Sequence, residues 1–322
     1  MNIALCIIIV NWNTKALLAN CLKSLLEIDW QSLKTSIDIL VVDNASSDGS
    51  SVMVKESFPQ ITLIESDRNL GFGGGVNKAA GMNKAKYYLV SNADMVYSFS
   101  VIKTLLSCLE SDISVSAVAP KLIGMDGKRQ PSAFKFPSIT RLFFEQFLSL
   151  GNFGEVKLKD DLSHEPEAHL TRTIEADWVL GAAFIIRSDD FHDINGFDEE
   201  YFMYSEETDL FFRLKGKGVR ILYFLDVTAL HIGRGSSSQV SEKMLIQQTK
   251  SLVLYFKKNK GRISGLIAFL IILIGQTGRV IVLKVLSLLL FWDKDYRERA
   301  NIYSDLLKGL ILSKKGAGKI TN

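Results

Sequence analysis

The stretch YYLVSNADM, residues 87–95, begins as a buried strand and ends in polar residues. Its first four residues are aromatic or branched, the types that fit a pleated sheet covered on both faces. Asn92 and Asp94 follow at the point where the strand should end. A turn would explain both residues, because short polar side chains hydrogen-bond to nearby backbone in turns. Whether this carboxylate serves a turn or a ligand depends on the sequence around it.

The residues before this stretch alternate between strand patterns and helix patterns. Strands are predicted over residues 3–10, 37–43 and 61–66, and helices over residues 14–26, 48–58 and 75–86. Alternation at this spacing is typical of βαβ units, whose strands run parallel in one sheet. The first hundred residues therefore predict a Rossmann-like α/β fold with a mostly parallel central sheet and flanking helices.

Polar residues follow each of the four predicted strands. The clusters contain Asn13, Asp43, Asn69 and Asp94. Ligands of parallel α/β sheets bind beyond the carboxyl ends of the strands, so four polar strand ends favour a binding site over four unrelated turns. In this interpretation Asp43 accepts hydrogen bonds from the base or ribose of a nucleotide, although a strand that leads into a capped helix would also explain it.

The glycine-rich segment NLGFGGGVNKA, residues 69–79, follows the third predicted strand. Gly71 and Gly73 match the first two glycines of the dinucleotide-binding fingerprint, but Val76 occupies the third position. The segment is therefore a poor match to a hydride-transfer enzyme. A glycine-rich turn before a helix lets a phosphate or a base approach the backbone closely, and a purely conformational role explains the glycines equally well.

The composition limits the class of protein. The 322 residues are 47% hydrophobic, which is ample for a large core, and the net charge of +3 gives no reason to expect nucleic acid as a partner. Cys6, Cys21 and Cys108 have no metal-ligand spacing, so reduced thiols in a cytosolic setting are expected. Residues 3–10 lack the basic start and the small-residue cleavage site of a signal peptide, and we expect them to form the first buried strand.

Two further groups of residues are candidates for chemistry. Glu206, Glu207 and Asp209 place three carboxylates within four positions before a predicted amphipathic helix. They either complement the helix dipole or supply a general base within reach of a nucleophile. His231 follows a predicted strand and, together with Asp94 and phosphate oxygens, would hold Mn²⁺ or Mg²⁺ if the fold brought the two residues together. A lone histidine at this position is otherwise a surface or capping residue.

Two later segments depart from the strand and helix alternation. Residues 155–173 are polar and aperiodic, which predicts a long loop. The composition changes again at Ser251, so we predict a first domain over residues 1–250 and a helical region over residues 251–322. Two apolar runs, separated by Arg279, suit membrane-surface helices or a re-entrant hairpin, with a buried helical pair as the soluble alternative. A basic cluster precedes them at Lys257, Lys258, Lys260 and Arg262.

Seven blocks of the sequence, taken in order, resemble the family 2 glycosyltransferases, which are inverting enzymes with the GT-A fold. The blocks are IIIVNWN, VVDNASSDGS, NLGFGGGVNKA, SNADM, DWVLGAAFIIR, GFDEEYFMYSEETDLFFRLKGKGVRILY and LHIGRGSS. The resemblance runs from Ile7 to about Ser238 and thus covers most of the chain. The subgroup looks like the bacterial rhamnosyltransferases of cell-surface polysaccharide assembly.

The resemblance implies a role for the polar strand ends. NAD at residues 92–94 resembles the metal motif of the family, with asparagine in the first position. Asp94 would then bind a divalent metal, Mg²⁺ or Mn²⁺, that bridges the diphosphate of the donor, and His231 looks like the later metal ligand. The implied nucleotide contacts are Asn13, Asp43, Asn69, Gly71 and Asn92.

The resemblance also implies a base and an acceptor pocket. Glu207 matches the position of the general base, where the family usually has aspartate, so Glu206 and Asp209 stay open as alternatives. Asp177, Trp178 and Glu206 lie where the family forms its acceptor pocket. Trp178 would either stack on a sugar or serve as a structural tryptophan.

The implied activity is transfer of rhamnose or a related hexose from a dTDP- or UDP-sugar to a saccharide linked to polyprenyl diphosphate. The reaction would belong to cell-surface polysaccharide biosynthesis at the cytoplasmic face of the bacterial inner membrane. The alternative is a nucleotide-binding or scaffold protein that has the fold without catalysis. The residues offer no Ser-His-Asp or Cys-His candidate for a covalent nucleophile.

Overall fold

The computed structural model describes residues 4–148, 172–233, 241–289 and 294–312. The chain forms two compact units. The first, here the sheet unit, comprises residues 1–136, 161–202 and 206–239, and the second, here the helical unit, comprises residues 137–160, 203–205 and 240–322. The loop predicted over residues 155–173 lies outside the described residues except for its last two positions, and Thr173 begins a strand.

The sheet unit is built on one large sheet with the strand order β3-β2-β1-β4-β11-β6-β12-β5. Strands β1 to β4 are parallel, as predicted, and the antiparallel strand β11 joins them to β6 and β12, which are parallel to each other. The strands are β1 (Leu5–Asn11), β2 (Ile37–Asp43), β3 (Thr62–Glu65), β4 (Tyr87–Asn92), β5 (Met95–Val96), β6 (Val115–Ile123), β11 (Ala183–Arg187) and β12 (Arg220–His231).

Four shorter strands complete the unit. Strands β7 (Arg129–Gln130) and β9 (Thr173–Glu175) pair with β6 and β12, and β8 (Ala133–Phe134) pairs with β10 (Trp178–Val179) in a separate ladder. Strand β12 is the longest of the sheet, and its pairing with β6 shifts register between Phe224 and Thr228.

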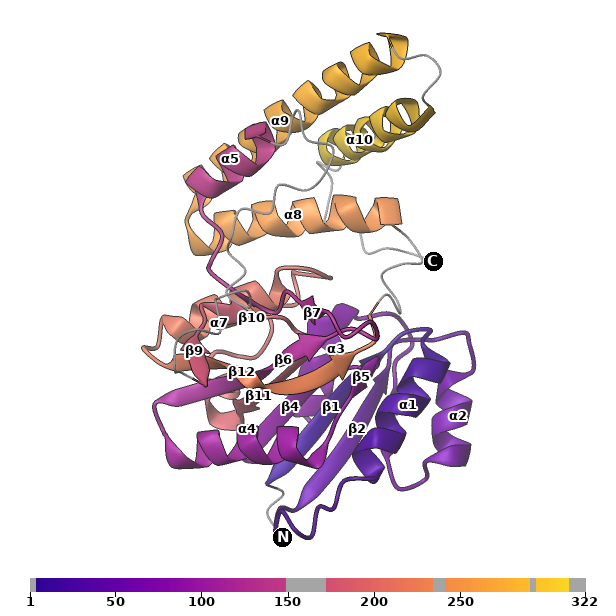
Figure 1. Ribbon diagram of the computed structural model, residues 1–322, viewed down its shortest axis with the longest axis vertical. Coiled ribbons are helices and arrows are strands. Elements are labelled where there is room, and N and C mark those ends of the chain that lie inside the picture. Colours follow the sequence, from indigo (N-terminus) through magenta and orange to yellow (C-terminus); the bar gives the residue numbers. More distant parts are fainter. Residues whose placement is uncertain (1–3, 149–171, 234–240, 290–293, 313–322) are drawn as a thin grey trace. The chain divides into compact units, whose positions relative to one another are not determined.

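Helices cover both faces of this sheet (Figure 1). Side chains alternate along each strand, so Ile7 and Ile9 belong to one core, while Cys6 and Ile8 belong to the other. The first core is closed by α1 (Lys15–Leu26), α2 (Ser50–Ser57) and α4 (Phe99–Ser111), and the second by α3 (Gly71–Ala80), α6 (Ser188–Asp193) and α7 (Glu206–Lys215). Both faces are buried, which explains why the strand sequences are continuously apolar.

Helix α3 begins and ends earlier than the predicted range of 75–86. The chain turns at Gly71, whose φ of +76° starts the helix four residues early. After Gly81 the chain leaves the helix because Tyr87 enters β4 opposite Leu5. The periodic pattern therefore located the helix, while the turn residue and the strand register set its ends.

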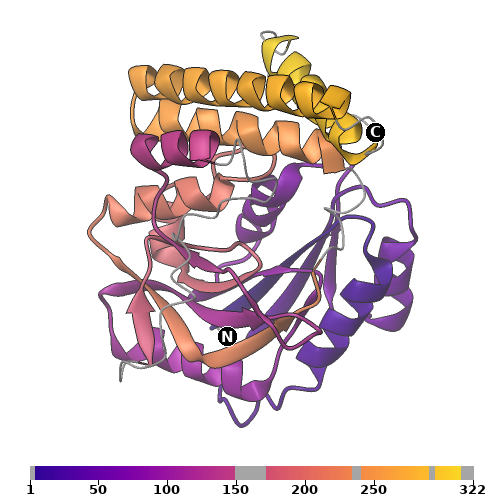
Figure 2. The ribbon, with the colours of Figure 1, turned by 45° about the horizontal axis from the view of Figure 1, so that its top comes forward.

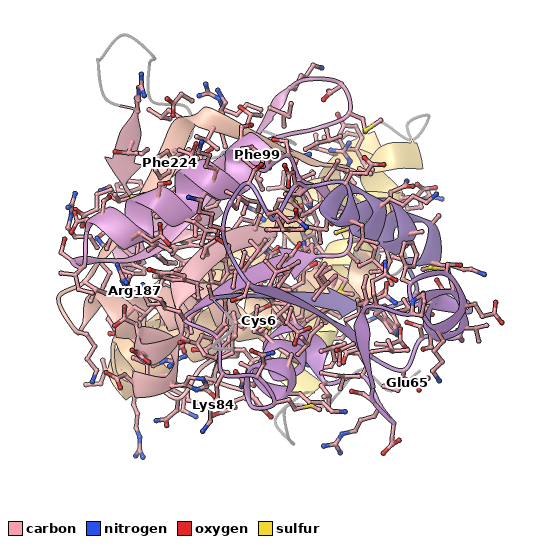
Figure 3. All side chains as sticks on the ribbon, turned by 90° about the horizontal axis from the view of Figure 1, so that it is seen from below. Cys6, Glu65, Lys84, Phe99, Arg187 and Phe224 are labelled. Carbon is pink, nitrogen blue, oxygen red and sulfur yellow. The ribbon has the colours of Figure 1, made fainter. Side chains whose placement is uncertain are left out.

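Arg187 stabilises the edge of the sheet that lies opposite the polar strand ends. It is paired with Tyr87 at the start of β4, and Figure 3 views the molecule from this side. Its Nε donates to the Val115 carbonyl at 2.8 Å, and its Nη2 donates to the carbonyls of Leu109 and Asp112 near the end of α4. One guanidinium thus satisfies carbonyls that a helix end would leave without partners.

The helical unit contains α5 (Ile139–Leu148), α8 (Ser241–Asn259), α9 (Arg262–Leu289) and α10 (Lys294–Leu312). Helix α9 packs against the other three, and Figure 2 shows α8 and α9 running side by side. The two apolar runs on either side of Arg279 form this one helix, and not a helical pair or a re-entrant hairpin. Among the described residues, α9 is the one helix whose length and composition would allow it to cross a membrane.

Candidate active site

Asp94 lies at the carboxyl edge of the sheet, between the end of β4 and the short strand β5. Strand β5 runs antiparallel to the end of β12, where His231 is opposite Met95. The amide of Ile232 also donates to the Asp94 carbonyl at 3.0 Å. These backbone contacts bring Nε2 of His231 to 3.2 Å from Oδ1 of Asp94. The two candidate metal ligands are therefore neighbours.

Gln130 fixes which ring nitrogen of His231 carries the proton. Its Nε2 donates to the His231 carbonyl at 2.9 Å, and because a carbonyl oxygen only accepts, this bond orients the amide group. The Gln130 Oε1 then lies 2.6 Å from Nδ1 of His231 and must accept from it. In the neutral ring, Nδ1 is therefore protonated, and the lone pair of Nε2 faces Asp94.

The residues present fit a divalent cation. A lone pair of Nε2 and a carboxylate oxygen 3.2 Å apart repel each other unless a proton or a metal ion lies between them. Mn²⁺ accepts oxygen and imidazole ligands, and Mg²⁺ is commonly held by one or two protein ligands plus phosphate oxygens and water. Within the described residues no group of three or more His, Cys, Asp or Glu is placed to hold a metal. Asp94 and His231 therefore suit a cation that is completed by the substrate.

Asp43 and Asn13 hold together the loops that follow β1 and β2. Asp43 is buried, and its carboxylate accepts from Nδ2 of Asn11 at 2.8 Å and from the Ser46 amide at 3.0 Å. Asn13 has a left-handed backbone, with φ of 54°, and its Oδ1 accepts from the Ser47 amide at 2.7 Å. Both residues thus shape this edge of the sheet, and their contact with a nucleotide stays a prediction.

Asn69 and Gly71 form the turn that starts helix α3. The Gly71 amide donates to Oδ1 of Asn69 at 2.9 Å, and a Cβ on Gly71 would lie 2.0 Å from the carbonyl oxygen of Phe202. A Cβ on Gly73 would likewise lie 2.8 Å from the side chain of Phe197. These glycines therefore have a conformational and packing role, and a phosphate contact at this turn stays a prediction. Asn92 is half-buried, and its amide donates to the Ala182 carbonyl.

Glu206 and Glu207 open helix α7 as a coupled pair of carboxyl groups. Burial raises the pKa of Glu206 well above its usual range, and the charge of Glu207 raises it further. Burial also raises the pKa of Glu207, but hydrogen bonds from its own amide, from the Gly181 amide and from Glu206 oppose that rise. Both shifts favour the protonated form, and the hydrogen bonds that oppose the rise at Glu207 make Glu207 the better candidate for the proton acceptor.

Glu207 lies at the same end of β4 as Asp94. A Cβ on Gly181 would lie 3.7 Å from Oε1 of Glu207, and the carbonyl of the next residue, Ala182, accepts from the Asn92 amide at 2.9 Å. Strand β11 then continues antiparallel to β4 from Ala183, opposite Ser91. This short path places the candidate base and the candidate metal ligands at one edge of the sheet.

Asp209, the third carboxylate of the cluster, has a structural role. Its side chain is buried and pairs with Nε of Arg213 at 2.7 Å, and the hydroxyl of Tyr201 lies 3.4 Å away. Arg213 in turn donates to the Ile194 carbonyl through Nη1 at 2.6 Å. Because Arg213 neutralises Asp209, the geometry favours Glu207 over Asp209 as the proton acceptor.

Asp177 and Trp178 stabilise the ladder of β8 and β10. Asp177 accepts from the Phe136 amide at 2.9 Å and lies 3.9 Å from Nζ of Lys215. Trp178 stacks on Phe134 with ring centroids 4.3 Å apart, and its Nε1 donates to the Lys135 carbonyl at 3.0 Å. These contacts account for both residues structurally, and their contact with an acceptor stays a prediction.

Residues 6–167 match the model of the glycosyl transferase family 2 domain. The matched segment contains Asp94, Gln130 and the polar strand ends. The chain belongs to glycosyl transferase family 2. It is a glycosyltransferase with the GT-A fold, and its central sheet carries the parallel strands β1 to β4.

Two curated relatives of this family 2 chain are rhamnosyltransferases. It is 26% identical over 230 residues to the N-acetylglucosaminyl-diphospho-decaprenol L-rhamnosyltransferase of Mycobacterium tuberculosis, with 68% of this chain and 74% of that protein covered. It is 26% identical over 198 residues to the rhamnosyltransferase WbbL of Escherichia coli, with 59% and 71% covered. The family 2 chain is thus rhamnosyltransferase-like.

The fold is shared with a solved mannosyltransferase. PcManGT from Pyrobaculum calidifontis, solved in complex with GDP-Man and Mn²⁺, aligns with a TM-score of 0.59 over 98% of this chain and 89% of that one. The identity is 15%, so the likeness concerns the fold alone. It agrees with the predicted GT-A architecture.

Sequence reasoning missed Gln130 and Gly181. Gln130 lies in a short polar segment without periodicity, and only the pairing of β7 and β12 with β6 reveals that it meets His231. Gly181 lies between β10 and β11, where an added Cβ would lie 3.2 Å from the Phe72 ring and 3.7 Å from Oε1 of Glu207. Gly181 belongs to the block DWVLGAAFIIR, but the block does not reveal that this residue lies beside Glu207.

We predict that Gln130→Leu weakens Mn²⁺ binding by about 10–100-fold, the usual effect of removing a group that orients a metal-binding histidine. The variant removes both hydrogen bonds to His231, so the ring loses its fixed tautomer. Electron paramagnetic resonance of free Mn²⁺, with nucleoside diphosphate present, measures the affinity. Gln60→Leu, at an exposed glutamine, is the matched control. Equal affinities of Gln130→Leu and wild type would show that Gln130 does not act on the site.

Proposed function

We propose that this chain catalyses metal-dependent, inverting transfer of a sugar from a nucleotide-sugar donor to a hydroxyl group of a lipid-linked saccharide. The carrying observation is the pair of Asp94 and His231, whose Oδ1 and Nε2 atoms lie 3.2 Å apart. A divalent cation, Mg²⁺ or Mn²⁺, when bound there would stabilise the negative charge of the departing nucleoside diphosphate. The presence of Mn²⁺ with GDP-Man in the structurally similar PcManGT supports this proposal.

In the proposed mechanism Glu207 accepts the proton of the acceptor hydroxyl as that oxygen attacks the anomeric carbon. A positioned base of this kind contributes about 10²–10⁴-fold to the rate. In the same proposal the proton of the pair resides on Glu206, which borders the acceptor together with Asp177 and Trp178. The proposed nucleotide contacts are Asn13, Asp43, Asn69, Gly71 and Asn92.

The proposed donor is a dTDP- or UDP-sugar that carries rhamnose or a related hexose. The names of the two curated relatives support rhamnose, and the mycobacterial relative supports an acceptor that carries N-acetylglucosamine on a polyprenyl diphosphate. Such an acceptor is embedded in a membrane, so the reaction would take place at the cytoplasmic face of the bacterial inner membrane. We assign transfer to residues 1–250 and membrane association to residues 251–322.

The test is a screen of the purified full-length protein against a panel of nucleotide sugars with Mg²⁺ or Mn²⁺. N-acetylglucosaminyl-diphospho-polyprenol in detergent serves as the acceptor, and release of nucleoside diphosphate is the readout. We expect turnover with dTDP-rhamnose that stops when EDTA removes the metal. A strict preference for UDP-sugars would show that rhamnose is not the sugar transferred. No turnover with any donor, combined with tight nucleotide binding, would instead favour the non-catalytic scaffold.

A further inference from the structure

Helix α9 exposes one continuous stripe of large apolar side chains. Residues on this stripe recur at intervals of three, four and seven, so they lie on one face of the helix. The side chains of Ile263 and Leu288, near its two ends, are 76% and 78% exposed. The middle of the stripe is formed by Leu266, Leu270, Ile274 and Ile281, all exposed.

The opposite face of α9 is buried, and it combines small and polar residues with the apolar Ile272, Val280 and Leu283. A Cβ on Gly265 would lie 2.7 Å from Cβ of Lys257 in α8, and one on Gly275 would lie 2.8 Å from Cβ of Gln146 in α5. Gln276 is buried, and its Nε2 donates to Oε1 of Gln146 at 3.1 Å. Large apolar side chains therefore lie on the exposed face as well as on the packed face. A surface helix of a water-soluble domain carries charged and polar residues on its exposed face, so the exposed stripe of α9 departs from that pattern.

The neighbours of α9 argue against a position across the bilayer. Helices α5, α8 and α10 pack against α9, and the exposed residues of α9 are the apolar stripe together with Arg262, Thr277 and Lys284. The same helices expose charged groups, among them Lys258 in α8 and Arg297 and Lys308 in α10. If α9 crossed the membrane in this bundle, these charges would have to enter the hydrocarbon, which is costly.

The basic residues near α9 indicate that the apolar stripe binds to an anionic surface. Lys257, Lys258, Lys260 and Arg262 are exposed at the junction of α8 and α9, and Lys284 lies at the border of the stripe. The stripe itself carries no acidic residue. An apolar face bordered by basic side chains is the pattern that binds the interface of anionic membranes.

We infer that α9 lies in the plane of an anionic phospholipid leaflet, with its apolar stripe immersed in the interface and its other faces covered by α5, α8 and α10. The inference deepens the membrane association of the proposed function by specifying the segment, the face and the orientation. The helical unit is thereby a monotopic membrane-docking unit, and α9 does not span the bilayer.

The first experiment measures binding of the full-length protein to vesicles by co-sedimentation, without donor or acceptor. Vesicles of phosphatidylcholine with phosphatidylglycerol are compared with vesicles of phosphatidylcholine alone. We expect the anionic vesicles to bind more protein, and the double variant Ile274→Glu with Ile281→Glu to lower the partition coefficient at least tenfold. Ile113→Glu is the matched control, because Ile113 is an exposed isoleucine of the sheet unit. Circular dichroism verifies that both variants keep the helical content of wild type.

Unchanged vesicle binding by the double variant would overturn the inference. If the variant instead turned a dimer into a monomer, the stripe would be an interface between two copies of the chain. Sugar transfer is assayed separately in detergent, so vesicle binding without transfer would reject the proposed function alone. Transfer in detergent without vesicle binding would reject the docking face alone.

The second experiment measures the orientation of α9 with single spin labels at Ile263→Cys, Ile274→Cys and Leu288→Cys. Cys108 is replaced by serine in this background, while burial raises the pKa of Cys6 and of Cys21 to about 12, which keeps both thiols unreactive. Accessibility to oxygen and to a water-soluble nickel reagent reports the depth of each label. We expect similar depths at all three sites. A deep label at residue 274 between two shallow ones would show that α9 spans the bilayer.

Discussion

Replacing Asp94 by asparagine is expected to lower kcat by at least about 10³-fold while the protein stays folded. The change removes one negative charge without changing the shape of the side chain. A cation at this site would then lose the carboxylate of Asp94, and electrostatic stabilisation of the departing diphosphate by a metal is worth several kcal/mol, where each 1.36 kcal/mol is a factor of ten in rate. Nucleoside diphosphate release and Mn²⁺ binding are the two measurements.

The fold should tolerate this change, because the asparagine Nδ2 can donate to the lone pair of His231 that now faces a carboxylate. The melting temperature and the circular dichroism spectrum should therefore match those of wild type. Asp29→Asn, at an exposed aspartate beside Ser32, is the matched control and should leave kcat unchanged. Normal turnover of Asp94→Asn would remove Asp94 from the site and with it the proposed metal dependence.

Replacing Glu207 by glutamine is expected to lower kcat by about 10²–10⁴-fold, with little change in nucleotide affinity. Glutamine keeps the size of the side chain and its capacity to form hydrogen bonds, but it cannot take a proton from the acceptor hydroxyl. The wild-type kcat should fall at low pH as Glu207 becomes protonated. Because burial raises the pKa of Glu207, this fall should occur at a higher pH than for an exposed glutamate. The acid limb should be absent from the residual activity of the variant.

Glu206→Gln provides the matched comparison, since it keeps a hydrogen-bond donor next to Glu207. Burial and the charge of Glu207 both favour the protonated form of Glu206, so a neutral amide should be tolerated there with a much smaller loss of kcat than that of Glu207→Gln. If Glu206→Gln lost more activity than Glu207→Gln, the base would be Glu206. Near-normal kcat in both variants would leave the pair without a role in proton transfer.

The parallel half of the sheet was predictable from sequence because its strands are short, continuously apolar and separated by helices. The range of β2 was predicted without error, and α1 to within one residue. The antiparallel half was not predictable in the same way. Strand β5 has only two residues, and its pairing with β12 depends on contacts far away in the chain. Helix α5 lies in a segment where no helix was predicted.

The residues of the candidate site could be predicted from the sequence, but the contacts between them could not. Sequence reasoning identified Asp94 and His231 and required that the fold bring them together, which only the pairing of β5 with β12 does. Gln130 could not be found, because a glutamine in a polar stretch carries no signal until its hydrogen bonds are seen. The choice between Glu207 and Asp209 likewise needed the ion pair of Asp209 with Arg213.

The position of β12 between β6 and β5 has a consequence for how a cell makes this enzyme. His231 is 101 residues further along the chain than Gln130, and Asp94 is made earlier still. At about 5–20 residues per second, a nascent chain carries Asp94 without its partner histidine for on the order of ten seconds. A cation that binds as proposed therefore cannot guide assembly of the parallel half, which has to form by hydrophobic packing alone. Cells starved of the metal should accordingly accumulate a folded, protease-resistant and inactive enzyme that regains activity when the metal is supplied.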